Sequence, residues 1–312
     1  MSSGGIYMIK NLFTPAMVAA TTLAMSAAFS APAFANEQQK ADEDSSPESW
    51  RLSTGLNYSK GSYGEIDDTK VVSAPIGLKY TKGNFSIRVS VPYVRVDGPG
   101  SLIQTPEGSG SGSNSGSGRS GNSGHGSSNS GSGNSGSGGV EIDDSTGVPV
   151  SSKRSGFGDV VISATYSFDL GSDFYIDATG KVKVPTASTA KRLGTGEVDV
   201  TTGLDFVKSV GPATFYIHGR RKFAGKPTGS LIRSTWGAGG GASIKAGQAI
   251  TLGADYDWQE SAFAGNPANS DVTAWASARL NSKMNLSIFG STGLNNNSAD
   301  FAGGIGLSIK LN

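Results

Sequence analysis

Residues 174–184 read FYIDATGKVKV, and apolar or small residues alternate with polar or charged ones through the stretch. Phe174 and Ile176 fall on one phase of this alternation, whereas Asp177 and Lys181 fall on the other. Successive side chains of a β-strand point to opposite faces, so the spacing predicts a strand with one apolar and one charged face. In a soluble protein the apolar face would lie in the core, whereas in a membrane barrel it would face lipid.

The same alternation recurs between turn signals along the chain and predicts about twelve β-strands. The predicted strands cover residues 50–59, 71–81, 85–96, 158–168, 173–184, 196–208, 213–223, 232–245, 249–260, 271–280, 284–292 and 300–311. Short connections (82–84, 169–172, 209–212, 245–248 and 281–283) alternate with long ones (60–70, 97–157, 185–195, 224–231, 261–270 and 293–299). Short periplasmic turns and long extracellular loops are typical of antiparallel barrels in the outer membrane of Gram-negative bacteria.

Aromatic residues on the apolar phase of these strands fall into two sets. Near the long-loop ends lie Tyr58, Tyr93, Phe223, Trp236, Trp258 and Phe301, and near the short-turn ends lie Tyr80, Phe85, Phe168, Phe174, Phe206 and Phe215. Amphipathic rings prefer the headgroup region of a bilayer, whereas a soluble core does not sort rings by depth. The fold class predicted is therefore all-β, a transmembrane antiparallel β-barrel of outer-membrane type, with a soluble secreted β-protein as the alternative.

Two prolines need a special position in such a barrel. Pro75 and Pro92 each lie within a predicted strand, and each removes a hydrogen bond from the ladder. We expect both to lie near the extracellular rim, where strands extend past the membrane.

The first 35 residues have the pattern of a cleaved secretory signal peptide. Residues 8–10 give a basic start, 16–29 form an apolar stretch diluted by Thr and Ser, and Ala33-Phe34-Ala35 is a cleavage site of the small-x-small type. A short polar segment, 36–49, precedes the barrel predicted for 50–312.

Charge and cysteine content exclude several classes of function. The chain has 26 basic and 25 acidic residues, and removal of 1–35 takes away only Lys10, which leaves 25 of each. A net charge of zero argues against a nucleic-acid-binding protein, which usually has a basic surface. The chain has no cysteine, so disulfides, thiolate metal sites and cysteine catalysis are excluded.

One predicted loop contains a low-complexity tract. Within the long extracellular loop 97–157, residues 108–139 consist almost entirely of Gly, Ser and Asn and contain no apolar side chain. Such a segment has nothing to bury, so we expect a solvated coil that the barrel does not need.

Three segments of the chain resemble a known family. They are GFGDVVISATYSF (156–168), KVKVPTAS (181–188) and GTGEVDVTTGLDF (194–206). The family comprises outer-membrane proteins of Gram-negative bacteria that are described as transporters and linked to meta-cleavage degradation of phenols. The resemblance implies an outer-membrane barrel for the uptake of small organic compounds, and it implies no catalytic residues.

The residues themselves give little support for catalysis, metal or cofactor binding. Of the two histidines, His125 lies in the Gly/Ser tract and His218 lies on the interior phase, whereas an outer-membrane lipase needs Ser and His facing lipid. The acidic segments 64–70 and 140–147 share Glu-Ile-Asp-Asp but match no EF-hand loop. GAGGG (237–241) has no phosphate-loop lysine, so we interpret it as a bend or as free lumen volume. We predict no enzyme, no cofactor and no metal.

Charged residues on the interior phase are the remaining candidates for function. The predicted lumen-lining set is Arg88, Asp177, Lys181, Lys183, Glu197, Asp199, Asp205, His218, Arg220, Lys222, Arg233, Asp255, Asp257 and Arg279, and the same phase carries Arg51, Lys79, Lys245 and Lys310. Such charges either pair into a plug or line an aqueous path, and the sequence leaves both open. Basic residues outnumber acidic ones in this set, so a path would favour anions.

The sequence therefore predicts a narrow channel or transporter for small organic or anionic solutes. Its expected partners are outer-membrane lipid and lipopolysaccharide, the barrel-assembly machinery and small solutes, but not nucleic acid. The alternative functions are a structural or adhesive surface barrel without a pore and a secreted soluble β-barrel protein that binds ligands.

Overall fold

The computed structural model describes residues 48–63, 68–98, 152–228, 230, 232–263 and 266–312. The predicted signal peptide, most of both acidic segments, His125 and the Gly/Ser tract lie outside these residues. The described residues all belong to one compact unit, 43–312. In this part of the chain, no helix is long and apolar enough to cross a membrane.

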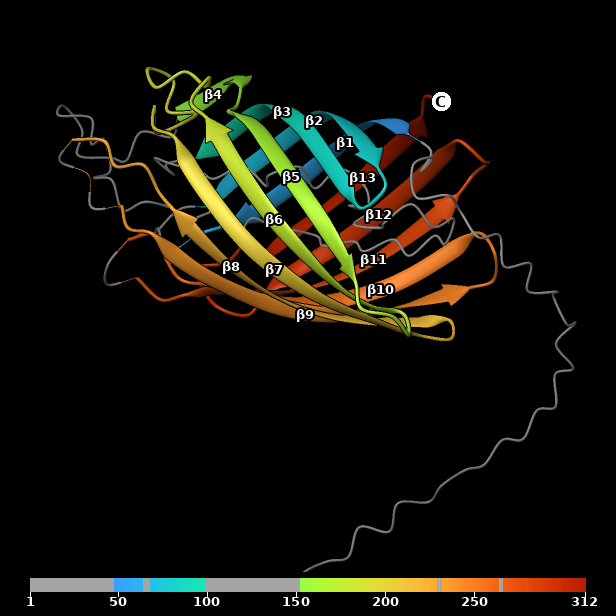
Figure 1. Ribbon diagram of the computed structural model, residues 1–312. Coiled ribbons are helices and arrows are strands. Elements are labelled where there is room, and N and C mark those ends of the chain that lie inside the picture. The colour runs from blue at the N-terminus through green and yellow to red at the C-terminus, as the bar shows by residue number, and fades with distance from the viewer. Residues whose placement is uncertain (1–47, 64–67, 99–151, 229, 231, 264–265) are drawn as a thin grey trace, which may run out of the picture. The chain divides into compact units, whose positions relative to one another are not determined.

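Thirteen antiparallel strands form the described fold (Figure 1). They are β1 (Ser49–Gly61), β2 (Thr69–Lys82), β3 (Phe85–Gly98), β4 (Ser152–Phe157), β5 (Val160–Asp169), β6 (Phe174–Val184), β7 (Asp199–Val210), β8 (Ala213–Phe223), β9 (Thr235–Ala246), β10 (Ile250–Gln259), β11 (Asn269–Arg279), β12 (Met284–Gly293) and β13 (Phe301–Lys310). Sequence neighbours pair side by side, and β1 pairs with β13, so the sheet closes on itself. The prediction of an all-β antiparallel barrel is confirmed.

β4 and β5 together form one strand of the wall, which makes the barrel twelve-stranded. Both pair with β3, through Tyr93 with Phe157 and Ser90 with Val161. Between these two pairs β3 advances by three residues while the facing chain advances by four, so one extra residue forms a β-bulge. The predicted boundary at 157/158 was therefore wrong, because 152–157 continue the wall strand and are not part of the loop 97–157.

The bulge decides which way the acidic residue beside it points. Gly158 donates its backbone N–H to the Pro92 carbonyl (2.8 Å). Without the extra residue, Asp159 would share the outward phase of Phe157, which is 63% exposed. With it, Asp159 is only 9% exposed and faces the lumen.

The two prolines lie near the middle of β2 and β3, so the prediction that places them at the rim was wrong. Pro75 and Pro92 are direct cross-strand partners. Pro92 presents its carbonyl to Gly158, so its missing N–H also falls on the β5 side, next to the bulge. On the other side, the β1–β2 pairing skips the residues opposite Pro75. Because the two prolines form a non-hydrogen-bonded pair, in which the N–H positions point away from the partner strand, the β2–β3 ladder itself loses no donor.

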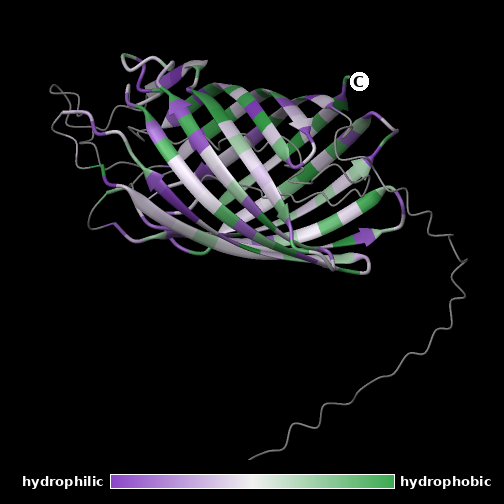
Figure 2. Cartoon of the chain, in the orientation of Figure 1, coloured by the Kyte–Doolittle hydropathy of each residue, from purple (hydrophilic) through white to green (hydrophobic). Residues whose placement is uncertain are grey.

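The wall has an apolar outer face and a polar inner face. Figure 2 shows the underlying alternation of hydrophobic and hydrophilic residues along the strands. Ile217 is 64% exposed, whereas its neighbour His218 is 8% exposed. The predicted aromatic residues lie on the outer face at both ends of the strands, and Tyr58, Tyr93, Phe223, Trp236 and Phe301 at the long-loop end are all exposed. An outer surface of this kind is suited to lipid.

Candidate functional site in the barrel lumen

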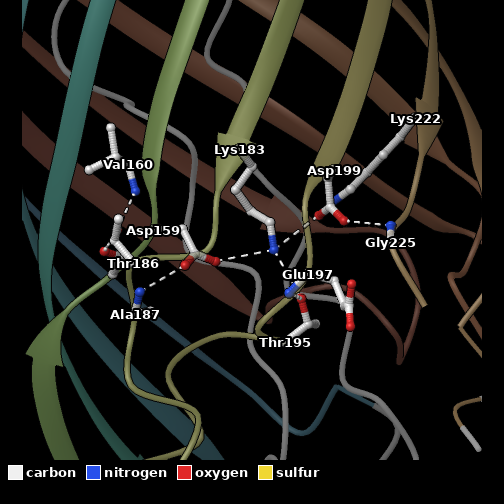
Figure 3. Close-up of polar contacts among 11 residues, drawn as sticks. Asp159, Val160, Lys183, Thr186, Ala187, Thr195, Glu197, Asp199, Lys222 and Gly225 are labelled. Atoms are coloured by element: carbon white, nitrogen blue, oxygen red, sulfur yellow. Dashed lines mark hydrogen bonds and ion pairs between the residues drawn. The ribbon is translucent and has the colours of Figure 1, made fainter. Parts of the chain in front are cut away.

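Lys183 of β6 lies at the centre of an ion-pair network near the long-loop end of the lumen (Figure 3). Its Nζ lies 3.1 Å from Asp159 Oδ2 and 3.2 Å from Asp199 Oδ2, and it donates to Thr195 Oγ1 (3.1 Å). Lys222 Nζ of β8 approaches the same Asp199 oxygen at 3.2 Å. The four charged side chains are 6–12% exposed, so their charges are poorly screened by solvent.

The second oxygen of each aspartate holds a loop. Asp159 Oδ1 accepts the backbone N–H of Ala187 (2.9 Å), and Asp199 Oδ1 accepts that of Gly225 (2.9 Å). Thr186 completes the attachment at the bulge, because its hydroxyl accepts from Val160 N (2.9 Å) and donates to Gly158 O (3.3 Å). The network therefore joins the bulge, three wall strands and two loops into one unit.

The loop 185–198 covers part of the inner wall at this end. Leu193 is 8% exposed, and a Cβ atom added to Gly156 would meet its Cδ1 at 2.8 Å. Gly156 shares the inward phase of Arg154, which is buried. The loop thus packs against the lumen side of β4 and narrows the mouth of the barrel.

Further down the lumen, His218 reaches across one strand. Its Nε2 lies 2.9 Å from Asp257 Oδ1, although His218 belongs to β8 and Asp257 to β10. Gly239 of β9 lies between them in register and has no side chain to obstruct the contact. On the neighbouring strand pair, Arg220 lies 3.7 Å from Asp205.

A third group of charges belongs to β1, β2 and β3. Arg51, Lys79 and Arg88 are consecutive cross-strand partners, and Lys79 is only 8% exposed. Lys79 interacts electrostatically with both arginines, and also with Asp177 of β6. Two wall strands separate β2 from β6, so this attraction between Lys79 and Asp177 acts through the lumen and not between neighbouring strands.

The structure places most of the predicted lumen residues on the inward phase of a strand. These are Arg88, Asp177, Lys181, Lys183, Asp199, Asp205, His218, Arg220, Lys222, Asp255 and Asp257. Arg279 also falls on the inward phase, but it is exposed because β11 ends there, at the short-turn side. The other two lie outside the strands: Glu197 precedes β7, and Arg233 precedes β9 and donates through Nε to Ser261 O (2.9 Å). The predicted strands 196–208 and 232–245 were therefore too long at these ends, because loop contacts replace the ladder there.

Several inward-facing residues were missed by the sequence reasoning. Asp159 was missed because the bulge changes its phase, and no local sequence pattern indicates a bulge at this position. Asp271, in contrast, follows the regular alternation of β11 and could have been predicted. Trp275 and Phe289 are cross-strand partners that face the lumen. Aromatic side chains therefore lie on the inner face of the wall as well as in the two outer belts. Among the described residues, no three His, Asp or Glu side chains form a metal-ion site.

Solved structures match this fold. The COG4313 outer-membrane channel from Pseudomonas putida F1 matches with a TM-score of 0.56 and 12% sequence identity, over 84% of this chain and 95% of that chain. The KdgM porin (TM-score 0.48, 7% identity, 83% and 99% covered) and the translocator domain of the autotransporter NalP from Neisseria meningitidis (0.45, 11%, 86% and 90%) also match. No family model and no curated protein matches the chain. The chain has the fold of outer-membrane β-barrels.

Proposed function

We propose that this protein is a narrow outer-membrane channel for the passive passage of small organic or anionic solutes. The proposal rests chiefly on the inner face of the closed barrel, which carries ion pairs and polar side chains from most of its strands. A barrel that served only as a scaffold could fill its interior with apolar side chains at lower electrostatic cost. The fold likeness to the COG4313 outer-membrane channel supports the same proposal.

The proposed location is the outer membrane of a Gram-negative bacterium, with the long loops outside the cell. The apolar outer face and its two aromatic belts support the location in the membrane. The orientation follows from the loop lengths, since the short turns of such barrels face the periplasm. Outer-membrane lipid, lipopolysaccharide and the barrel-assembly machinery are the corresponding proposed partners. The resemblance of 156–168, 181–188 and 194–206 to transporters linked to phenol degradation directs the choice of solutes toward small aromatic compounds.

Planar-bilayer conductance and liposome swelling test the proposal. We expect single-channel steps in KCl, and swelling with small solutes that declines as the solute grows, because a twelve-stranded lumen is narrow. The heat-denatured protein, identified by its shifted migration on a detergent gel, is the control. Absence of both conductance and solute flux would favour the alternative, a structural or adhesive barrel without a pore.

A further inference from the structure

Basic side chains occupy most positions of one row of cross-strand partners that extends over eight strands of the barrel, here called the cation row. The register links Lys310 to Arg51, Arg51 to Lys79, Lys79 to Arg88, Arg88 to Ser163, Ser163 to Lys181, Lys181 to Thr201 and Thr201 to Lys222. Six of these eight inward-facing residues are basic and the other two carry hydroxyl groups. No acidic residue interrupts this cation row.

The cation row crosses most of the barrel height. Lys310 and Arg51 lie at the short-turn ends of β13 and β1, whereas Lys222 lies at the long-loop end of β8. Strands are about 4.8 Å apart and tilt by about 35–45°, so seven steps raise the row by roughly 20 Å. The apolar band of such barrels is about 25 Å tall. The row therefore leads from one mouth of the lumen almost to the other.

Acidic residues occupy most positions of a second row, which runs parallel to the cation row and extends further around the barrel. It runs through Asp177, Asp205, His218, Gly239, Asp257 and Asp271, from β6 to β11. Where both rows are present, on β6 to β8, they lie four residues apart along the strand, which is about 13 Å. The charges of these two rows are thus sorted by sign, whereas Lys183, Asp159, Asp199 and Arg220 belong to neither row.

The half of the cation row nearer the short turns holds like charges side by side. Arg51, Lys79 and Arg88 occupy three adjacent strands, and like charges directly opposite one another destabilise a sheet. Asp177 of β6, which two wall strands separate from β2, attracts the Lys79 ammonium. Three basic side chains on adjacent strands give this part of the lumen a local excess of positive charge, so the cluster is suited to a further anion.

We infer that Arg51, Lys79 and Arg88 form an anion-binding site on the solute path, and that small carboxylates are its ligands. The inference rests on the proposed channel function. A guanidinium presents a planar fork of N–H donors that matches a carboxylate, and two such forks flank the Lys79 ammonium. Lys310 on one side and Lys181 on the other supply further attachment points, so a bound carboxylate can advance along the row in both directions, on the Lys181 side as far as Lys222, which is paired with Asp199.

Current block by benzoate tests the site. In planar bilayers with KCl, we expect benzoate to interrupt the wild-type current in a concentration-dependent manner, and chloride to be favoured over potassium. In the double variant Lys79→Met/Arg88→Gln, the chloride-to-potassium permeability ratio should fall by at least about threefold, and the block should disappear. Arg88→Lys keeps the charge but loses the fork, so it should keep the ion preference and weaken the block.

Lys245→Met is the matched control, because Lys245 shares the inward phase but lies outside the cation row. It should behave like wild type, and heat-shifted migration on a gel should verify that each variant is folded. Wild-type channels that conduct without benzoate block would overturn the anion site and leave the proposed channel standing. Unchanged selectivity in the folded double variant would do the same. A wild-type protein without any conductance would instead overturn the channel itself.

Discussion

Gly239 shows how single small residues shape the lumen. A Cβ atom at this position would lie 2.5 Å from the Tyr256 carbonyl oxygen and 2.7 Å from His218 Nε2. Gly241, two residues along the same inward face, would place a Cβ atom 2.4 Å from Asp255 Oδ1. The glycines of 237–241 therefore give room to polar side chains from β8 and β10, which occupy the space that we interpreted as free lumen volume.

Gly239→Ala should destabilise the barrel by about 1–3 kcal/mol, because the methyl group must displace backbone or the His218 ring. Gly219→Ala is the control, since a Cβ atom at Gly219 would meet nothing within 4 Å. Urea unfolding in detergent, followed by tryptophan fluorescence, measures both variants. Equal midpoints for the two variants would contradict this account of β9.

At the scale of elements, the β4–β5 strand and the loop 185–198 depend on each other. The bulge turns Asp159 inward, and Asp159 then holds both Lys183 and the start of the loop. Lys183 also contacts Thr195 near the end of the same loop. A single lysine thus joins the two ends of the loop to the wall, and the loop narrows the lumen at its mouth.

Lys183→Met should release this loop, because Asp159 and Thr195 lose their shared partner while Asp199 keeps Lys222. If the free energy of local opening of the loop falls by about 1.4 kcal/mol, tryptic cleavage after Lys191 should become about tenfold faster, because the cleavage rate is proportional to the fraction of molecules in which the loop is open. Mass spectrometry of the fragments measures the rate at that bond. Lys181→Met, two residues away on the same face, is the control and should leave the rate near that of wild type.

For the whole molecule, the described strands close into a barrel through pairs whose members are far apart in the sequence. Arg51 pairs with Lys310, and the Asn312 side chain bonds the backbone of both Glu48 and Trp50. β3 and β4 are paired from Tyr93 with Phe157 to Gly98 with Ser152. The two chain segments that lead to the Gly/Ser tract are therefore already held together by the wall.

Deletion of 108–139 should leave the barrel intact, because the ladder between β3 and β4 brings the ends of the loop together and loop-closure entropy changes only slowly with length. Heat-shifted gel migration and single-channel conductance should both match those of the full chain. Failure of the shortened chain to form a heat-shifted barrel would show that the tract contributes to assembly.

Local patterns in the sequence were sufficient for most of each strand and for the two faces of the wall, but not for β4 or for the starts of β7 and β9. Alternation is a property of neighbouring residues, so FYIDATGKVKV (174–184) already distinguishes the apolar face from the charged one. The aromatic belts follow from position along each strand, which the turns reveal. These features can be predicted without knowing which strands pair with each other or in which register they pair.

Only the tertiary structure decided which lumen charges meet. Lys183 contacts Asp159 because a bulge adds one residue, and His218 reaches Asp257 because β9 places a glycine between them. The alignment of Arg51 with Lys79 and Arg88 depends on the register of three strands. Register is set by cross-strand pairing around the closed wall, which is a non-local property, and a shift of two residues would keep every face while changing every lumen contact.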